Sequence, residues 1–292
     1  MVISQILGGL GNQMFQFAAG RALSLERGQR LCLDISGFGD YPPHQGFELH
    51  RIFDCRVPNA TEAEVRAVLG WQFSPSVRRI VGRPGWGWTR RPGFVVEPSF
   101  AYWAGLNEVP LDCYLVGYWQ SMKYFEKYAP VLRRDFSFLA QKGMRDSAMA
   151  QQISQSNAVS IHLRRGDYLP DPGISAKHGV CSLDYYETAI RHIADRLDRP
   201  TFFVFSDDIE WVRKNLKIAA PCQYVDHNRG ASSFVDMYLM SLCQHNIIAN
   251  SSFSWWAAWL NSNVEKMVLT PKKWFLQDID TSDLIPQGWI SL

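Results

Sequence analysis

The sequence of 292 residues predicts an α/β protein whose strands are mostly parallel. The N-terminus shows an apolar strand, a glycine-rich loop, a helix and a second strand, which together make a βαβ unit. The second half alternates short apolar stretches with amphipathic ones, as strands and crossover helices do. A chain of this length is long enough for two domains of about 150 residues or for one large α/β domain.

The N-terminal unit is predicted to start with a strand at 2–7 and a glycine-rich loop at 8–13. A helix is expected at 14–26, because apolar residues recur there on one helical stripe. A second strand is expected at 31–35. From residue 41 to 110 the pattern loosens, and proline–glycine pairs indicate turns and loops.

The C-terminal half is predicted to alternate strands with helices. A polar stretch at 141–157 lacks strand character, so we expect one domain at 1–150 and another at 151–292. The expected strands are 158–163, 201–205, 222–225, 246–249 and 267–270, and the expected helices are 183–197, 209–216, 232–244 and 253–260.

Composition and charge disfavour several classes of protein. The net charge of +2 is too small to favour nucleic acid as a partner. No Lys or Arg precedes Arg21, so the N-terminus lacks the basic region of a signal peptide, and no apolar run approaches the ~20 residues of a membrane span. The six cysteines show neither a CxxC pair nor zinc spacing. We therefore expect a cytoplasmic protein with reduced cysteines.

Two adjacent arginines, Arg164 and Arg165, directly follow the apolar strand at 158–163. Ligands of open α/β sheets bind at the carboxyl ends of strands, and guanidinium groups match phosphate oxygens bidentately. His162 and Asp167 flank the arginines, and the whole cluster predicts a diphosphate ligand. The alternative is a surface turn with solvated arginines.

Two further strand ends carry groups that suit a nucleotide. Asp207 and Asp208 close the strand at 201–205, where a carboxylate can accept bonds from a ribose hydroxyl or a guanine N–H. Alternatively, Asp208 simply caps the next helix. The run 250–256 places several serines at a helix N-terminus, which predicts either a phosphate site or an N-cap.

The glycine-rich loop departs from the fingerprint of dinucleotide-binding folds. Met14 stands where the third glycine would allow close helix packing, although Asp34 follows at about the expected distance. We therefore disfavour a dehydrogenase. The amides of Asn12 and Gln13 are expected either to bind a ligand or to cap the helix.

Two other features have both a functional and a structural explanation. Asp278 and Asp280 match the Asp-x-Asp pattern of metal-dependent sugar transferases, but no apolar strand precedes them and we expect a solvated loop. Residues 65–96 contain no Asp or Glu but carry six arginines, from Arg66 to Arg91, and three tryptophans. This basic region is expected to face an anionic acceptor or a membrane surface, or else to be a solvated insertion.

With these motifs assembled, the chain resembles the bacterial α-1,2-fucosyltransferases, a family of inverting glycosyltransferases. The matching stretches follow the family's order across nearly the whole chain, and only residues 40–105 fall outside them. The stretches are GGLGNQMFQF at 8–17, GYWQS at 117–121, HLRRGDY at 162–168, FSDD at 205–208, NSSFSWW at 250–256 and PKKWF at 271–275.

The resemblance implies a GT-B-like fold, in which an acceptor-side Rossmann-like domain at 1–150 and a GDP-sugar-binding one at 151–292 face an active-site cleft. It implies GDP-β-L-fucose as co-substrate, α-1,2 transfer to a galactose-containing oligosaccharide or glycolipid, and no metal or other cofactor. A cytoplasmic location follows, with the basic region at 66–91 as a candidate for peripheral contact with the inner membrane. Two alternatives stay open, namely another GDP-sugar as donor and a non-catalytic nucleotide-sugar-binding protein.

The resemblance also implies roles for individual residues. Arg164 is expected to contact the diphosphate as a catalytic residue, with Arg165 and His162 assisting, and Asp207 is expected to contact the guanosine. Asn12 is expected to act in catalysis, and it would reach the fucose or diphosphate together with Leu10 and Gly11. The residues expected to line the phosphate and base are Ser252, Phe253 and Ser254.

The general base is not identified by sequence. Asp167 is the nearest candidate, although an Asp beside two arginines can instead orient them. Asp34, Glu48 and Glu187 are further candidates.

Overall fold

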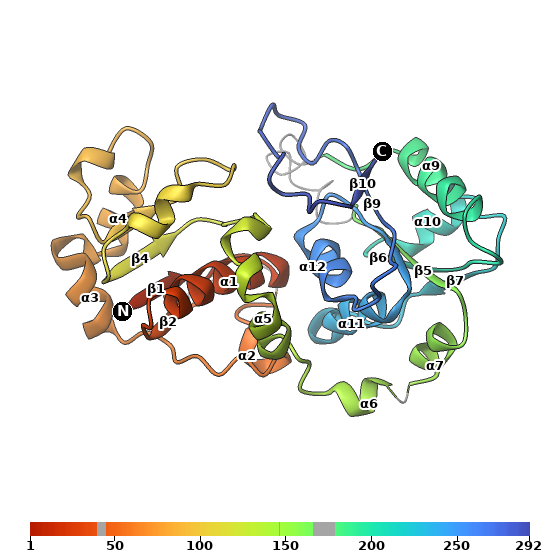
Figure 1. Ribbon diagram of the computed structural model, residues 1–292, viewed down its shortest axis with the longest axis horizontal. Coiled ribbons are helices and arrows are strands. Elements are labelled where there is room, and N and C mark those ends of the chain that lie inside the picture. Colours follow the sequence, from red (N-terminus) through yellow and green to blue (C-terminus); the bar gives the residue numbers. More distant parts are fainter. Residues whose placement is uncertain (40–44, 146, 166–178) are drawn as a thin grey trace. The chain divides into compact units, whose positions relative to one another are not determined.

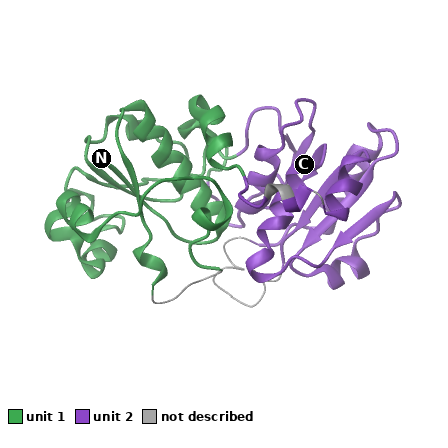
Figure 2. Ribbon diagram, turned by 90° about the horizontal axis from the view of Figure 1, so that it is seen from below, with its two compact units in different colours: residues 1–137, 280–284 green, residues 138–279, 285–292 purple. Residues whose placement is uncertain are grey.

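The computed structural model of the protein (Figure 1) describes residues 1–39, 45–145, 147–165 and 179–292. They form two compact units, each with its own parallel sheet (Figure 2). Unit 1 contains residues 1–137 and 280–284, and unit 2 contains residues 138–279 and 285–292.

Unit 1 is built on a four-stranded sheet in the order β2-β1-β4-β3. Its strands are β1 (Val2–Gln5), β2 (Leu31–Asp34), β3 (Phe94–Val96) and β4 (Cys113–Val116). Its α-helices are α1 (Leu10–Glu26), α2 (Leu49–Ile52), α3 (Glu62–Leu69), α4 (Pro75–Val81) and α5 (Ala129–Asp135). Short 3-10 helices are η1 (Ser36–Phe38), η2 (Gly70–Phe73), η3 (Gly87–Thr89), η4 (Ala104–Glu108), η5 (Met122–Tyr124) and η6 (Glu126–Tyr128).

The predicted βαβ start is present, but helix α1 begins at Leu10 rather than at Met14. The turn out of β1 is completed by two glycines, because Gly8 has a φ of +77° and Gly9 is the extended N-cap residue. Leu10, Gly11 and Asn12 are therefore part of the first helical turn and not of a loop.

Helices cover both faces of the unit 1 sheet. Ile3 on β1 packs on one face in a cluster with Val68 of α3 and Phe94 of β3. The next residue, Ser4, faces α1 and donates a hydrogen bond to the carbonyl of Gln16 at 2.9 Å. Strands β3 and β4 were not predicted, because prolines and glycines interrupt the pattern there and each strand is only three or four residues long.

Unit 2 is built on a six-stranded sheet in the order β10-β9-β8-β5-β6-β7, and its paired strands are parallel. All five strands and four helices predicted in this half are confirmed. The strands are β5 (Ala158–Leu163), β6 (Thr201–Ser206), β7 (Cys222–Val225), β8 (His245–Ile247), β9 (Val268–Thr270) and the unpredicted β10 (Ile290–Ser291). The helices are α6 (Gln141–Arg145), α7 (Ala148–Ser154), α9 (Leu183–Ala194), α10 (Ile209–Asn215), α11 (Phe234–Leu242), α12 (Ser252–Leu260) and the 3-10 helix η7 (Gly230–Ser232).

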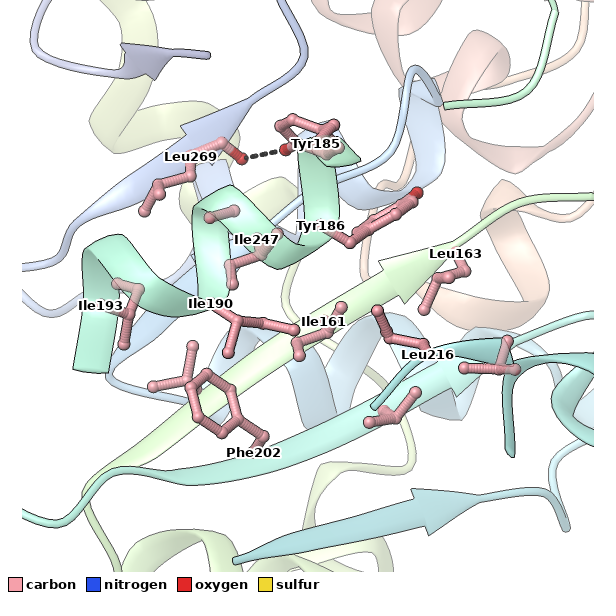
Figure 3. Packing of buried hydrophobic residues seen from close by; sticks show 14 of the residues in the cluster. Ile161, Leu163, Tyr185, Tyr186, Ile190, Ile193, Phe202, Leu216, Ile247 and Leu269 are labelled. Atoms are coloured by element: carbon pink, nitrogen blue, oxygen red, sulfur yellow. Dashed lines mark hydrogen bonds between the residues drawn. The ribbon is translucent and has the colours of Figure 1, made fainter. Parts of the chain in front are cut away.

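Alternation along β5 directs successive side chains to opposite faces of the unit 2 sheet. Ile161 and Leu163 point into a cluster with Ile190 of α9 (Figure 3). In the same view the hydroxyl of Tyr185 donates to the carbonyl of Leu269 at 3.0 Å, which ties α9 to β9. His162, which lies between Ile161 and Leu163 on β5, therefore points to the opposite face of the sheet.

Each sheet has one point where the strand order reverses. In unit 2 the chain moves from β5 outward to β6 and β7, and then returns to place β8 on the other side of β5. In unit 1 the chain places β2 on one side of β1 and β4 on the other. Open α/β sheets bind ligands outside the carboxyl ends of the strands at such switch points.

The boundary between the units lies earlier than the expected division after residue 150. It falls between Ser137 and Phe138, so α6 and α7 belong to unit 2. The polar composition of 141–157 indicated a domain boundary there, but Ala150 and Ile153 of α7 are buried and the helix packs against α11.

Composition predicted reduced cysteines, and all six are free thiols, four of them buried. No helix in the described ranges combines the length and the apolar character that crossing a bilayer demands.

Candidate active site

Arg164 and Arg165 leave the carboxyl end of β5 and are held by acids that follow β6. One carboxylate oxygen of Asp207 accepts the backbone N–H of Arg165 at 2.9 Å, and the other lies 3.3 Å from Nε of Arg164. The guanidinium of Arg165 lies 3.3 Å from the ring centroid of Trp211, and its Nε is 3.8 Å from Asp208. Both side chains are largely buried, at 24% and 16% exposed. This geometry is not the solvated turn that the sequence left open.

The two acids after β6 have different structural tasks. Asp208 caps α10, because its carboxylate accepts the N–H of Trp211 at 3.3 Å. Its own N–H donates to the hydroxyl of Ser206 at 3.0 Å, which fixes the turn. Asp207 instead accepts the backbone N–H of Arg165 and pairs with the guanidinium of Arg164, which its charge orients.

His162 is a neutral imidazole at the same sheet edge. Burial, reinforced by the charge of Arg164 and opposed by Asp207, lowers the pKa of His162 to about 4. Its ring lies 5.9 Å from the ring of Phe253, between centroids. Within the described residues its buried Nδ1 has no hydrogen-bond partner. At pH 7 it is therefore suited to exchange a hydrogen bond with a ligand, and not to supply positive charge.

The N-terminus of α12 follows β8 across the switch point from Arg164. Ser252 and Phe253 are half-buried there. Ser254 is fully buried, and its hydroxyl donates to the carbonyl of Ser251 at 3.3 Å, so any contact of Ser254 with a phosphate would come from its backbone N–H. Within the described residues the N-cap residue Ser251 makes no side-chain capping bond. Simple capping therefore does not account for this serine.

Asn250, at the start of the same run, is structural. Its amide nitrogen donates to the carbonyls of Gly179 at 3.2 Å and Trp274 at 3.1 Å, and its oxygen accepts from the thiol of Cys181 at 3.3 Å. These bonds hold the end of β8 and the 271–275 motif together beneath the site.

Gln13 in unit 1 is also structural, although the sequence left ligand binding open. Its side chain is fully buried. The amide nitrogen donates to the carbonyls of Gly8 and Gly46, both at 2.8 Å, and the oxygen accepts the N–H of Glu48 at 3.0 Å. This side chain therefore connects the glycine turn with the segment before α2.

Asn12 lies at the switch point of unit 1 and bonds to the segment that follows β4. It is half-buried in the first turn of α1, beside the buried Leu10 and Gly11. Its side-chain oxygen accepts a hydrogen bond from the amide of Gln120 at 2.8 Å, and Gln120 follows β4. The 8–17 and 117–121 motifs thus meet at one edge of this sheet.

The candidate bases have separate surroundings. Asp167 lies outside the described residues. Burial raises the pKa of Asp34, but bonds from Tyr114, Ser36 and Arg78 more than offset it and lower that pKa. Glu48 is buried with a raised pKa and pairs with Arg51 at 2.7 Å, whereas Glu187 is exposed on α9.

A carboxyl group that sequence analysis missed follows β3. Burial raises the pKa of Glu97 to about 7, although it accepts backbone N–H bonds. Its sequence neighbourhood, a short strand and then Pro98, gave no signal for it.

The Asp-x-Asp pattern near the C-terminus is exposed. Asp278 and Asp280 are both on the surface, and Asp280 accepts the N–H of Ser282 at 3.0 Å. Among the described residues, no group of three His, Cys, Asp or Glu side chains is arranged to hold a metal ion.

Two guanidinium groups at the switch point of one Rossmann-like sheet suit a diphosphate ligand, and the two Rossmann-like units give the chain a GT-B-like fold. The solved structure of the fucosyltransferase NodZ from Bradyrhizobium has this fold, with a TM-score of 0.55, 18% identity, and 88% of this chain and 91% of that chain covered. Residues 104–292 match the model of glycosyl transferase family 11. The chain belongs to this family and is a glycosyltransferase.

Three curated relatives narrow the chemistry. An α-1,2-colitosyltransferase of Escherichia coli is 34% identical, with 100% of this chain and 99% of the relative covered. The O-antigen biosynthesis glycosyltransferase WbnK of Escherichia coli is 35% identical, with 99% of each covered. Galactoside 2-α-L-fucosyltransferase SEC1 of Bos taurus is 25% identical, with 87% of this chain and 62% of the relative covered. The chain is thus similar to enzymes that transfer fucose or colitose to 2-hydroxyl groups.

Proposed function

We propose that this protein transfers L-fucose from GDP-β-L-fucose to the 2-hydroxyl of a galactose-type acceptor, with inversion to an α-1,2 linkage. The observation that carries the proposal is the pair Arg164 and Arg165, fixed by Asp207, Asp208 and Trp211 at the carboxyl end of β5. The galactoside fucosyltransferase among the relatives supports the sugar and the linkage.

Inversion is a single displacement at the anomeric carbon. The acceptor oxygen attacks this carbon while its bond to the diphosphate breaks, and negative charge grows on the departing GDP. Arg164 and Arg165 bind the diphosphate, so their charges act where the charge develops, and each well-placed group contributes about 3–4 kcal/mol. Their orientation is set before the donor binds, because Asp207 pairs with the guanidinium of Arg164, and Asp208 and Trp211 lie against that of Arg165.

The remaining donor contacts follow from the same edge. His162, being neutral, donates or accepts one hydrogen bond at the donor, and Phe253 lies beside its ring. The N-terminus of α12 with Ser252 and Ser254 binds phosphate oxygens through backbone N–H groups. We assign the guanosine to Asp207 and the sugar to the Leu10–Asn12 turn. Two fixed guanidinium groups neutralise the diphosphate, so we propose that the reaction needs no divalent cation.

Colitose is the second candidate sugar, and the full-length similarity to an α-1,2-colitosyltransferase favours it. Colitose is L-fucose without the 3-hydroxyl group. A pocket that hydrogen-bonds this hydroxyl rejects the deoxy sugar by about 10⁴–10⁵-fold, whereas an apolar pocket discriminates only about 10²-fold. The ratio of kcat/KM for GDP-fucose and GDP-colitose therefore decides between the two donors.

The deciding experiment incubates the protein with GDP-fucose and lactose in excess EDTA and reads the product linkage by NMR. A 2-O-fucosylated galactose supports donor, linkage and metal independence together. Release of GDP without a fucosylated product would still support GDP-fucose as the donor. Other acceptors would then be tested, such as O-antigen repeat units, which the name of one relative suggests. GDP binding without any turnover of either donor contradicts the proposal and favours the non-catalytic alternative.

We also propose that the basic region of unit 1 contacts an anionic membrane surface and places the reaction at the cytoplasmic face of the inner membrane. Trp71, Trp86 and Trp88 are exposed there, the last at 85%, together with the guanidinium groups of Arg79 and Arg83. Indoles occupy the headgroup layer, and each nearby arginine contributes about 1 kcal/mol on anionic lipid.

Vesicle sedimentation tests this contact. The protein is expected to sediment with phosphatidylglycerol vesicles and not with phosphatidylcholine vesicles, and to lose sedimentation in the Trp86→Ala/Trp88→Ala variant. Leu111→Ala is the matched control, because Leu111 is an exposed apolar residue of the same unit at 63%. Equal sedimentation of both variants would refute the assignment.

A further inference from the structure

Glu97 lies at the carboxyl end of β3, and the 117–121 motif folds around its side chain. Its two carboxylate oxygens accept the N–H groups of Tyr118 at 2.7 Å and Trp119 at 2.9 Å. A Cβ on Gly117 would come within 2.5 Å of the Glu97 Cβ and 2.7 Å of Oε2. Glycine at 117 is therefore what admits this carboxylate, and Trp119 in the same turn has a φ of +54°.

This carboxylate is part of the network at the unit 1 switch point. Gln16 of α1 donates to the carbonyl of Gly117 at 3.1 Å, and Gln120 donates to Asn12 at 2.8 Å. The ends of β1, β3 and β4 are neighbours in the sheet, so Glu97 and Asn12 belong to one edge. This is the edge at which α/β sheets bind ligands.

Glu97 is accessible to a ligand, and its pKa lies close to neutral pH. The residue is half-buried, and no described cationic side chain pairs with it. Burial raises its pKa to about 7, against the opposing effect of the two backbone bonds. The phenols of Tyr118 and Tyr124 lie near it, and burial raises the pKa of both, so they stay neutral around pH 7. Of Glu97 and these two phenols, only Glu97 therefore changes its charge near pH 7.

Two other carboxyl groups of unit 1, those of Asp34 and Glu48, already bond to other side chains. Asp34 bonds Arg78 and Tyr114, and Glu48 pairs with Arg51. Each oxygen of Glu97, in contrast, uses one lone pair for a backbone N–H and retains a second. The ring of Tyr118, 41% exposed beside it, offers an apolar face to a sugar.

We propose that Glu97 is the general base of the transfer and binds the reacting hydroxyl of the acceptor. The inference rests on the proposed inverting function. The O–H bond of the acceptor breaks and its proton moves to a carboxylate oxygen of Glu97. The acceptor oxygen forms the new bond to the anomeric carbon, and the electron pair of the old bond leaves with GDP. The balance needs no further reactant.

The Glu97→Gln variant tests the role, because glutamine keeps the shape but cannot take the proton. We expect transfer to a hydroxyl acceptor to fall about 10²–10⁴-fold. GDP affinity should stay at the wild-type value, since the donor-binding arginines belong to unit 2. Asp135→Asn is the matched control, being a part-buried carboxyl of the same unit that pairs with Arg21 at 2.9 Å, and it should retain transfer.

Azide separates proton transfer from a purely structural role. Azide is a nucleophile with no proton to lose, so fucosyl azide formation by Glu97→Gln should match the wild-type rate. Parallel loss of both reactions would show that Glu97 only holds the 117–121 loop and would overturn the proposal. Wild-type transfer to the hydroxyl by the variant would overturn it as well.

The pH dependence of the wild-type enzyme is an independent test, which applies even if the variant does not fold. Its kcat/KM for the hydroxyl acceptor should rise with pH through about 7, because the ionised carboxylate is the active form, and azide transfer should lack this limb. The same limb with both acceptors would contradict the base assignment. Absence of wild-type transfer to any hydroxyl acceptor is a different result, since it would refute the proposed function itself.

Discussion

At the scale of single residues, Arg164 carries the largest predicted effect on activity. The Arg164→Ala variant should reduce kcat by about 10²–10³-fold or more, because it removes a charge aimed at the departing diphosphate. Its thermal unfolding should stay close to that of the wild type, since the β5 core lies on the other face of the strand. Steady-state kinetics and a melting curve measure both.

Arg213 supplies the matched control for Arg164. It lies in the same unit, pairs with Asp226 at 3.2 Å, stacks on Tyr224 at 4.3 Å and is 41% exposed. Arg213→Ala should leave kcat unchanged. If both variants were equally active, the assignment of Arg164 to the diphosphate would be wrong.

His162 predicts a pH dependence of stability. Its folded pKa of about 4 lies below the ordinary value of 6.5, so below pH 6.5 the unfolded state takes up a proton that the folded state refuses. The contribution is full above pH 6.5 and is lost as the pH falls to about 4. It should amount to about 1–3 kcal/mol.

Urea unfolding between pH 7 and 4 measures this contribution. The wild type should lose more stability over this range than His162→Gln does, whereas substitution of the exposed His227 should leave the slope unchanged. Parallel pH profiles for the wild type and His162→Gln would contradict a depressed pKa at His162.

At the scale of elements, the turn after β4 depends on the absence of a side chain at Gly117. Gly117→Ala places a Cβ 2.5 Å from that of Glu97, and such overpacking should cost about 1–3 kcal/mol of unfolding free energy. The displaced loop should also lower kcat through Glu97.

Gly37→Ala is the control for this substitution, because a Cβ there meets no atom within 4 Å. Urea denaturation should show the loss only for Gly117→Ala. Equal stability of the two variants would mean that the loop relaxes freely and that Glu97 is not tightly enclosed.

At the scale of the whole molecule, the division into two units predicts where GDP acts. GDP without a sugar should slow amide hydrogen exchange at the ends of β5 and β6 and at the N-terminus of α12. Ligand binding to the folded state slows the opening motions through which such amides exchange. Hydrogen–deuterium exchange with mass spectrometry resolves these segments.

The sheet of unit 1 is the internal reference in the same experiment. Its exchange should change little with GDP alone, since the proposed diphosphate and guanosine contacts lie in unit 2. Protection of β1 and β4, with none in unit 2, would overturn the placement of the nucleotide.

The amino-acid sequence by itself determined the second half of the fold and the position of the arginines. The strands at 158–163 and 222–225 appear with the predicted bounds, because short, mostly apolar stretches between amphipathic helices are a local pattern. Arg164 and Arg165 had to fall at a strand end for the same reason. Family 11 membership follows from motifs that lie along most of the chain.

The tertiary structure alone decided which side chains act together. Asp207 holds Arg164 and the backbone of Arg165, whereas Asp208 caps a helix and lies beside the Arg165 side chain, a division that neighbouring identical residues cannot reveal in sequence. The side chain of Gln13 bonds to the backbone of Gly46, and Glu97 accepts an N–H from the 117–121 loop. Both contacts arise because strand order brings distant loops to one sheet edge. Such pairings depend on long-range packing, and the surrounding burial then sets the pKa of each acid.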